Sequence, residues 1–349
     1  MKALYLDAPQ KPALRDIPEP VLNAGEALMR VRYVGLCGTD LNTFRGRNPL
    51  VTYPRILGHE ISATVEKVAE GAPAWIRPGV DVALMPYSSC GKCPSCRAGR
   101  PNACCTQKTL GVQRDGALAE WVAAPWEKLR TSETLSAREL CLVEPLTIGF
   151  HAVARARVQK SDTVLVIGCG MVGYGAIAAA AQRGATIIAL DLDDTKLAVA
   201  RQTGAAHTIN SHPSAIANGA SVHDRLLELT SGDGPNVTIE AAGAPDTFRM
   251  AVEEVAFAGR VAYVGWSKEP VTYDTRHFVQ KELDILGSRN STPEDFEAVI
   301  KMLERGEFPL ADTISAVVSL EQAGEALRAW AENPLAYRKI LVEVAANGR

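Results

Sequence analysis

The pattern of hydrophobic and polar positions changes near residue 150. Before that point, short runs alternate apolar with polar residues between Gly and Pro turns, which is typical of half-buried antiparallel strands. Strands are expected at 27–34, 61–68, 80–85 and 117–123. This part of the chain therefore predicts an all-β, barrel-like domain.

After residue 150, apolar runs rich in β-branched residues alternate with helix-like segments. Strands are expected at 163–168, 186–191, 207–210, 236–241, 260–265 and 283–287. Six strands with crossover helices predict an α/β fold with a doubly wound parallel sheet. Two helices, at 293–305 and 320–331, and a final strand at 339–344 complete the expected elements.

A glycine-rich turn follows the strand expected at 163–168. It has the form G-x-G-x-x-G between a strand and a helix, with an acidic residue ending the next strand, which is the context of a dinucleotide-binding (Rossmann) motif. The glycines allow a tight turn, the approach of a pyrophosphate and close helix–strand packing. A glycine-rich turn of another α/β protein is the alternative. The expected cofactor contacts are Gly168, Gly170, Met171, Val172, Gly173, Asp191 and Lys196.

Asp191 also indicates which dinucleotide binds. A carboxylate at this position accepts hydrogen bonds from a free ribose 2′-hydroxyl and repels a 2′-phosphate. Leu192 and Asp193 follow, so no Arg is adjacent. The sequence therefore predicts NAD rather than NADP.

Composition excludes several classes of protein. The chain has 349 residues, a net charge of -3 and 22% charged residues, so it has no basic surplus for a nucleic-acid partner. No apolar run reaches transmembrane length, and the first residues lack the apolar core of a signal peptide. We therefore expect a cytoplasmic protein without nucleic-acid or membrane partners, whose eight cysteines stay reduced.

Four of these cysteines form a compact group, Cys90-x-x-Cys93-x-x-Cys96 followed by Cys104. Four thiolates in a short loop suit a tetrahedral, fully occupied structural zinc. An iron–sulfur cluster or unligated thiols are the alternatives. Cys105 could compete with Cys104 as a ligand.

A second metal constellation is dispersed along the chain. Cys37, His59, Glu60 and Glu144 could supply a thiolate, an imidazole and a carboxylate and leave one position open, as in a catalytic zinc site. Thr39 lies at the same strand-to-helix turn as Cys37, and its hydroxyl could relay a proton or simply stabilise the turn.

Together, these motifs resemble those of the zinc-dependent medium-chain alcohol dehydrogenases over nearly the whole chain. The resemblance rests on Gly35-Leu-Cys37-Gly-Thr39-Asp40, on Gly58-His59-Glu60, on the four-cysteine group and on the glycine-rich turn. It implies a GroES-like catalytic domain at 1–150 and 288–349, a Rossmann domain at 151–287, and two zinc ions per chain, one catalytic and one structural. It also implies a homodimer or homotetramer.

The segment Val143-Glu144-Pro145-Leu146 resembles the polyol branch of this family, which includes sorbitol and threonine dehydrogenases. Glu144 stands where simple alcohol dehydrogenases have a cysteine, and the resemblance implies that Glu60 can exchange with it as a zinc ligand. Two positions depart from the family: Asn42 replaces a histidine that ends a proton relay, and Ala63 replaces a glycine.

The resulting interpretation is an oxidoreductase that transfers hydride reversibly between NAD and a secondary alcohol of a polyol, a sugar acid or a related hydroxy compound. Arg289 is the candidate anchor for a substrate carboxylate or vicinal hydroxyls, with a surface or inter-domain ion pair as its alternative role. Threonine or amino-alcohol dehydrogenation, a zinc-free reductase and a non-catalytic nucleotide-binding protein remain alternatives.

Overall fold

The structure is a computed structural model that describes residues 1–216 and 220–345. It contains two compact units. Unit 1 comprises 1–144, 296–306 and the chain from 310 onward, and unit 2 comprises 145–295 and 307–309. The sequence pattern puts the changes near 150 and 288 instead. Two limits between the units fall inside helices, α4 (Val143–Arg155) and α11 (Pro293–Glu304). The hydrophobic period of each helix is continuous there, so the sequence pattern does not show where the units divide.

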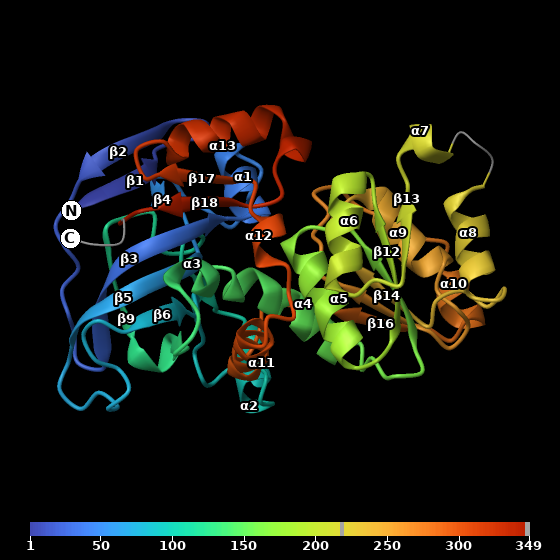
Figure 1. Ribbon diagram of the computed structural model, residues 1–349, viewed down its shortest axis with the longest axis horizontal. Helices are drawn as coiled ribbons and strands as arrows, with labels where there is room; N and C mark the ends of the chain where they lie inside the picture. The colour runs from blue at the N-terminus through green and yellow to red at the C-terminus, as the bar shows by residue number, and fades with distance from the viewer. Residues whose placement is uncertain (217–219, 346–349) are drawn as a thin grey trace. The chain divides into compact units, whose positions relative to one another are not determined.

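Unit 1 is built on a seven-stranded sheet with the order β10-β6-β5-β3-β18-β17, in which β9 also pairs with β3. The long strand β3 is its centre, because it pairs antiparallel with β5, β9 and β18. In this part of the chain the alternating pattern is confirmed as sheet structure (Figure 1). The strands are β3 (Glu26–Leu36), β5 (Glu60–Val68), β6 (Asp81–Leu84), β9 (Trp121–Pro125), β10 (Leu129–Thr131), β17 (Ala316–Ser319) and β18 (Ile340–Glu343).

A three-stranded sheet and several short elements complete unit 1. The apolar faces of the strands meet in one core that includes Leu36, Phe44 and Ile61, each 1% exposed. The three-stranded sheet has the order β2-β1-β4. These elements are β1 (Lys2–Leu6), β2 (Pro12–Asp16), β4 (Arg55–Ile56), β7 (Tyr87–Ser88), β8 (Lys108–Thr109), α1 (Gly38–Phe44), α2 (Pro94–Arg97), α3 (Ala137–Leu140), α12 (Leu310–Thr313) and α13 (Ala323–Glu332).

Unit 2 contains the doubly wound parallel sheet that the sequence predicts. Its six strands are all parallel, in the order β13-β12-β11-β14-β15-β16, so the direction of winding reverses between β11 and β14. Helices α5 and α6 cover one face, and α8, α9 and α10 lie on the other (Figure 1). The strands are β11 (Thr163–Ile167), β12 (Thr186–Asp191), β13 (His207–Asn210), β14 (Val237–Glu240), β15 (Arg260–Tyr263) and β16 (Asp284–Gly287). The helices are α5 (Met171–Gln182), α6 (Asp194–Thr203), α7 (Pro213–Ile216), α8 (Val222–Leu229), α9 (Pro245–Glu253) and α10 (Arg276–Gln280).

Two predicted elements begin three or more residues later than the sequence suggests. The strand expected at 117–123 begins only at Trp121, because residues 117 and 118 donate their backbone N–H groups to the loop at 57–58 rather than to a neighbouring strand. The helix expected at 320–331 begins at Ala323, since the side chain of Gln322 accepts a hydrogen bond from the backbone of Ser319 and forms a turn there. Among the described residues, no helix is long and apolar enough to cross a membrane.

Candidate metal and cofactor sites

The first candidate site forms at the carboxyl end of β3. Cys37 follows the last residue of this strand and is the N-cap of α1. The Cys37 backbone N–H donates to Oδ2 of the buried Asp40 at 2.9 Å, and Oδ1 of Asp40 accepts from the Gly58 N–H at 3.3 Å. Asp40 therefore fastens the turn that holds Cys37 to the loop that precedes His59.

Sheet register brings Cys37 close to His59 and Glu60. The ligand atoms of these three side chains all lie within 4.8 Å of one another. Gly35 is opposite Glu60 in the β3–β5 ladder, and a Cβ at position 35 would come within 2.0 Å of the Glu60 carboxylate. The glycine of the sequence motif therefore has a specific function here, which is to leave room for a carboxylate.

Glu60 is held by a buried lysine. Lys339 Nζ donates to Glu60 Oε1 at 2.8 Å and to Oε2 at 2.6 Å, and also to the Leu36 carbonyl at 3.0 Å. Burial alone would lower the pKa of Lys339, but the negative charges of Glu60 and then Cys37 raise it above its ordinary value. No pattern in the sequence indicates Lys339, because a single lysine before the last strand belongs to no motif.

The donor set fits a zinc ion. Thiolate, imidazole and carboxylate are the ligand types of zinc sites in proteins. Among the described residues, Nδ1 of the buried His59 has no hydrogen-bond partner and lies 3.8 Å from the Asp40 carboxylate. Burial lowers the pKa of His59, but Asp40 and then Cys37 outweigh burial, so the pKa stands above its ordinary value. This imidazole is thus set among negative groups, as a ligand of a divalent cation would be.

Glu144 and Thr39 lie outside the group of three. The Glu144 carboxylate is buried at the start of α4 and accepts a hydrogen bond from the Tyr87 hydroxyl. Burial raises the pKa of Glu144 to about 7. Thr39 is in the first turn of α1 and half-buried, and its carbonyl accepts a hydrogen bond from Thr43 at 2.8 Å. Their expected roles in zinc binding and proton transfer stay predictions.

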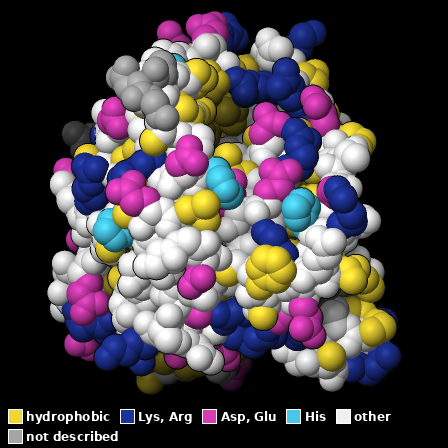
Figure 2. All heavy atoms as spheres, turned by 90° about the vertical axis from the view of Figure 1, so that its right-hand side faces the viewer, with side chains coloured by type: hydrophobic (Ala, Val, Ile, Leu, Met, Phe, Trp, Pro, Cys, Tyr) yellow, Lys and Arg dark blue, Asp and Glu magenta, His cyan; other side chains and the backbone are white. Residues whose placement is uncertain are grey.

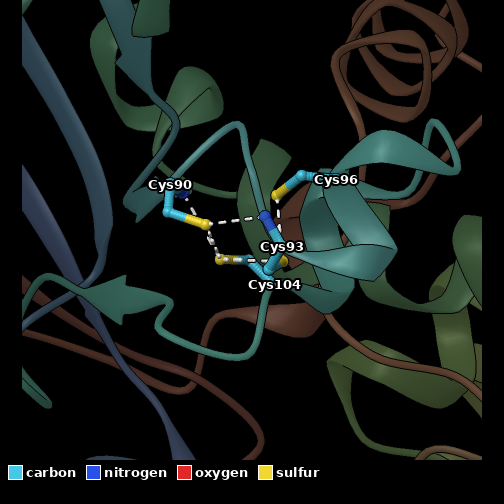
Figure 3. A group of neighbouring side chains, drawn as sticks. All are labelled: Cys90, Cys93, Cys96 and Cys104. Carbon is cyan, nitrogen blue, oxygen red and sulfur yellow. Dashed lines mark hydrogen bonds between the residues drawn. The ribbon is translucent and has the colours of Figure 1, made fainter.

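The second metal group is the four-cysteine loop (Figure 3). Cys90, Cys93, Cys96 and Cys104 converge, and their closest sulfur pairs are 3.4, 3.5 and 3.8 Å apart. These distances are too long for disulfides. Four sulfurs at about 2.3 Å from one tetrahedral ion would be separated by about 3.8 Å, so the spacing fits a single zinc.

Local hydrogen bonds prepare this loop to hold thiolates. A hydrogen bond from Ser95 and then backbone N–H groups lower the pKa of Cys93 to about 5. The backbone N–H groups of Cys90 and Cys93 also point to sulfurs of the group, at 3.3 Å each. Cys104 is buried within the group, whereas Cys105 is exposed and outside it. The structure therefore selects Cys104 as the fourth donor.

In unit 2, each glycine of the turn after β11 has a separate role. Gly168 has a φ of +95°, which turns the chain sharply. A Cβ at Gly170, the N-cap of α5, would meet nothing within 4 Å, so this side of the turn is open. A Cβ at Gly173 would lie 1.9 Å from the Gly168 carbonyl, so the helix packs directly on the turn. This geometry fits a pyrophosphate at a helix N-terminus.

The remaining predicted cofactor residues surround the same turn. The Asp191 carboxylate accepts from the Cys169 N–H at 2.7 Å and from the Asp193 N–H at 3.1 Å. Lys196, in α6, is near enough to lower the pKa of Asp193 and to oppose the strong rise that burial causes in the pKa of Cys169. Of the two residues that begin α5, Met171 is buried and Val172 is half-buried.

Arg289 lies two residues beyond β16 in unit 2 and is exposed. Its role as a substrate anchor stays a prediction.

Comparison with known proteins identifies both parts of the chain. Residues 23–133 match the model of the alcohol dehydrogenase GroES-like domain, and residues 172–305 match that of the zinc-binding dehydrogenases. An uncharacterised zinc-type alcohol dehydrogenase-like protein of Haemophilus influenzae is 35% identical and covers 97% of this chain and 98% of its own. L-galactonate-5-dehydrogenase of Escherichia coli is 31% identical over 88% of each chain.

Solved structures show the same architecture over the full chain. A dehydrogenase of Escherichia coli in complex with NADH matches with a TM-score of 0.88 and 28% identity, covering 98% of this chain and 99% of its own. Galactitol-1-phosphate dehydrogenase of Escherichia coli has the same score and identity, over 98% and 100%. A zinc-binding dehydrogenase of Sinorhizobium meliloti bound to NADP has a TM-score of 0.86 and 28% identity, over 98% of each chain.

Proposed function

Because the chain belongs to the zinc-dependent alcohol dehydrogenase family with a GroES-like domain, an enzyme family that acts on CH–OH groups, we propose that it oxidises a secondary alcohol of a polyol, sugar acid or sugar-alcohol phosphate reversibly with NAD. The observation that carries this proposal is the convergence of Cys37, His59 and Glu60 at the end of β3. A non-catalytic nucleotide-binding protein would have no need of such a donor set.

When bound, zinc polarises a substrate hydroxyl as a Lewis acid, and the nicotinamide accepts the hydride. The chain supplies the geometry for this chemistry. Cys37 and His59 are the proposed zinc donors, with Glu60 or Glu144 as the carboxylate donor. Thr39 is the proposed acceptor of the hydroxyl proton, because a hydroxyl can accept one proton while it passes on another. Asn42 does not titrate, so the proton leaves by a route other than a histidine at this position.

We infer NAD rather than NADP from Asp191. Related structures hold one or the other dinucleotide, so the choice depends on this chain's own residues. The Asp191 carboxylate is fixed at the glycine turn by two backbone N–H groups. A ribose 2′-hydroxyl can donate to it, whereas a 2′-phosphate would be repelled.

Two further parts of the proposal concern assembly and stoichiometry. We propose two zinc ions per chain, one at Cys37 and one in the four-cysteine loop. We also propose a homodimer or homotetramer in the cytoplasm. In support of self-association, β16 pairs with β15 on one side only among the described strands, and Ile285 in β16 is 42% exposed. Sedimentation at several protein concentrations tests this.

The function is tested by an NADH-absorbance screen of zinc-replete protein against polyols, sugar acids, sugar-alcohol phosphates, threonine and short primary alcohols. We expect the highest kcat/KM among the polyhydroxylated compounds, and its loss in the His59→Ala variant with folding intact. Best activity on ethanol would contradict the polyol assignment, and best activity on threonine would favour the amino-alcohol alternative. A chain that carries one zinc or none and oxidises nothing would favour the zinc-free or non-catalytic alternatives.

A further inference from the structure

The loop that follows β15 exposes an aromatic ring together with a lysine. Trp266 is 52% exposed. Lys268 Nζ lies 4.4 Å from the centre of the Trp266 ring, which is a cation–π contact. Among the residues that the structure describes, Lys268 has no carboxylate within ion-pair distance, although basic and acidic side chains intermingle over the face shown in Figure 2. Lys268 is exposed, so its ammonium is accessible to an anionic group of a ligand.

This loop is anchored from beneath. The buried Glu240 ends β14, and its carboxylate accepts from the Gly243 N–H at 2.7 Å, while its carbonyl accepts from the Gly265 N–H at 3.0 Å. A Cβ at Gly265 would lie 2.3 Å from Glu240 Oε2, so only glycine fits directly before Trp266. A Cβ at Gly243 would come within 3.2 Å of the Trp266 backbone. The position of Trp266 is therefore set by close backbone packing.

The loop also lies where a ligand is expected. The crevice in which doubly wound sheets bind ligands lies at the carboxyl ends of β11 and β14, where the winding reverses, and β15 is the next strand beyond β14. If the glycine turn after β11 binds the pyrophosphate and Asp191 at the end of β12 binds the adenosine ribose, the nicotinamide half of the cofactor would extend to the other side of β11, over β14 and β15. Hydride transfer requires the substrate carbon to lie about 3–3.5 Å from the nicotinamide. A substrate at that distance is also beside this loop.

We propose that Trp266 and Lys268 form a substrate-recognition pair, in which the indole face packs on the C–H groups of a polyhydroxylated chain and the ammonium binds an anionic group at its end. The proposal rests on the proposed NAD-dependent oxidation. The anionic group is a carboxylate or a phosphate, because the oxygens of either group can accept a charge-assisted hydrogen bond from the Lys268 ammonium. Arg289 would then be a second cation or have no part in recognition.

The test compares matched neutral and anionic substrates in the wild type and in variants. The three compounds are galactitol, a neutral polyol, galactitol 1-phosphate, which carries a phosphate, and galactonate, which carries a carboxylate. Lys268→Met should raise KM for the preferred anionic compound about 10- to 100-fold, the size of one charged contact, and leave KM for galactitol and for NAD unchanged. Trp266→Ala should raise KM for charged and neutral compounds alike, and Trp266→Phe should restore most of the loss.

Lys160→Met is the matched control. Lys160 is exposed and precedes β11 at the opposite, amino-terminal edge of the sheet, so its loss should change no KM. Equal effects of Lys268→Met on galactitol and on the anionic compounds would overturn the proposal, as would an effect on KM for NAD alone, which would place Lys268 on the cofactor. An effect confined to Arg289→Ala would overturn it as well.

Binding measurements separate this inference from the proposed function. Calorimetry of galactonate and of galactitol 1-phosphate with the NADH-loaded protein requires no turnover. A wild type that binds one of these anions at least tenfold more tightly than Lys268→Met, but oxidises none of the compounds, would refute the oxidation and keep the recognition pair. Equal dissociation constants for the two proteins would refute the recognition pair, whether or not the enzyme turns over.

Discussion

Replacing Lys339 by Met should destabilise unit 1 more than most single substitutions. The ammonium is bonded to both oxygens of Glu60, and the two side chains are 4% and 1% exposed. Met keeps the length of the apolar stem but leaves the Glu60 carboxylate buried without its counter-charge. Removal of one partner from a buried ion pair costs about 3–5 kcal/mol.

A double-mutant cycle shows whether the cost comes from the unpaired charge. Glu60→Gln in the Lys339→Met background removes the carboxylate charge, so the two substitutions together should cost less than the sum of the single ones. We expect a coupling of at least about 2 kcal/mol, since contacting residues couple by about 0.5–3 kcal/mol. Glu343→Gln, in the strand β18 that follows Lys339, is the control. It alters the Tyr33–Glu343 hydrogen bond, 2.6 Å long and partly buried, and should cost only about 1 kcal/mol.

Urea unfolding of metal-free protein, followed by tryptophan fluorescence, is the assay. Four of the five tryptophans lie in unit 1 and only Trp266 lies in unit 2, so the signal mainly follows the unit that contains the ion pair. The midpoint for Lys339→Met should fall with an unchanged slope. A free energy of unfolding within about 0.5 kcal/mol of the wild type, or strictly additive costs in the cycle, would refute the argument from an unpaired buried charge.

Three further predictions concern the other sites. Cys93→Ser should lower the zinc content by one ion per chain and reduce the melting temperature, whereas Cys105→Ser, outside the sulfur group, should keep both ions in metal analysis. Asp191→Asn should reduce the ratio of kcat/KM with NAD to that with NADP by about 10- to 100-fold, since it removes a negative charge beside the 2′ position; a wild-type preference for NADP would contradict this assignment. Burial raises the pKa of Glu240. Because its folded-state pKa is raised, the stability from Glu240 is present below its unfolded pKa of about 4.3 and is lost as pH rises through the folded value. The free energy of unfolding of Glu240→Gln should therefore increase relative to that of the wild type as pH rises from 4 to 8. A difference in unfolding free energy that stays constant, or that changes in favour of the wild type, would contradict this.

The sequence predicted an element correctly where its hydrophobic pattern was clearly that of a strand or clearly that of a helix. The central strands β11 and β12 of unit 2 are mainly apolar runs, and β12 and β13 begin and end at the predicted residues. The strand β17 was missed, because its side chains are all partly or fully exposed and give no alternation. The limits between the units fall inside α4 and α11. The hydrophobic period of a helix does not change at such a limit, so the sequence pattern could not locate it.

The candidate sites could be predicted as far as their chemistry is local in sequence. The four cysteines and the three glycines lie within short loops, so spacing alone brings them together. Tyr87 and Lys339 could not be assigned roles in advance, because each acts through a partner that is distant in sequence. Tyr87 and Glu144 are 57 residues apart, and Lys339 and Glu60 are 279 residues apart.

The buried ion pair of Lys339 with Glu60 also favours one register of β18 on β3. In the ladders around β3, Gly35 pairs with Glu60 and Leu36 pairs with Ile340. Lys339 therefore enters the sheet directly beside the carboxylate for which Gly35 leaves room. A slip of β18 by one residue would turn every side chain to the opposite face, which would leave Glu60 buried without a cation and remove Ile340 from the core. The ion pair and the apolar contacts thus favour the same register, and this register fixes the strand end that carries Cys37.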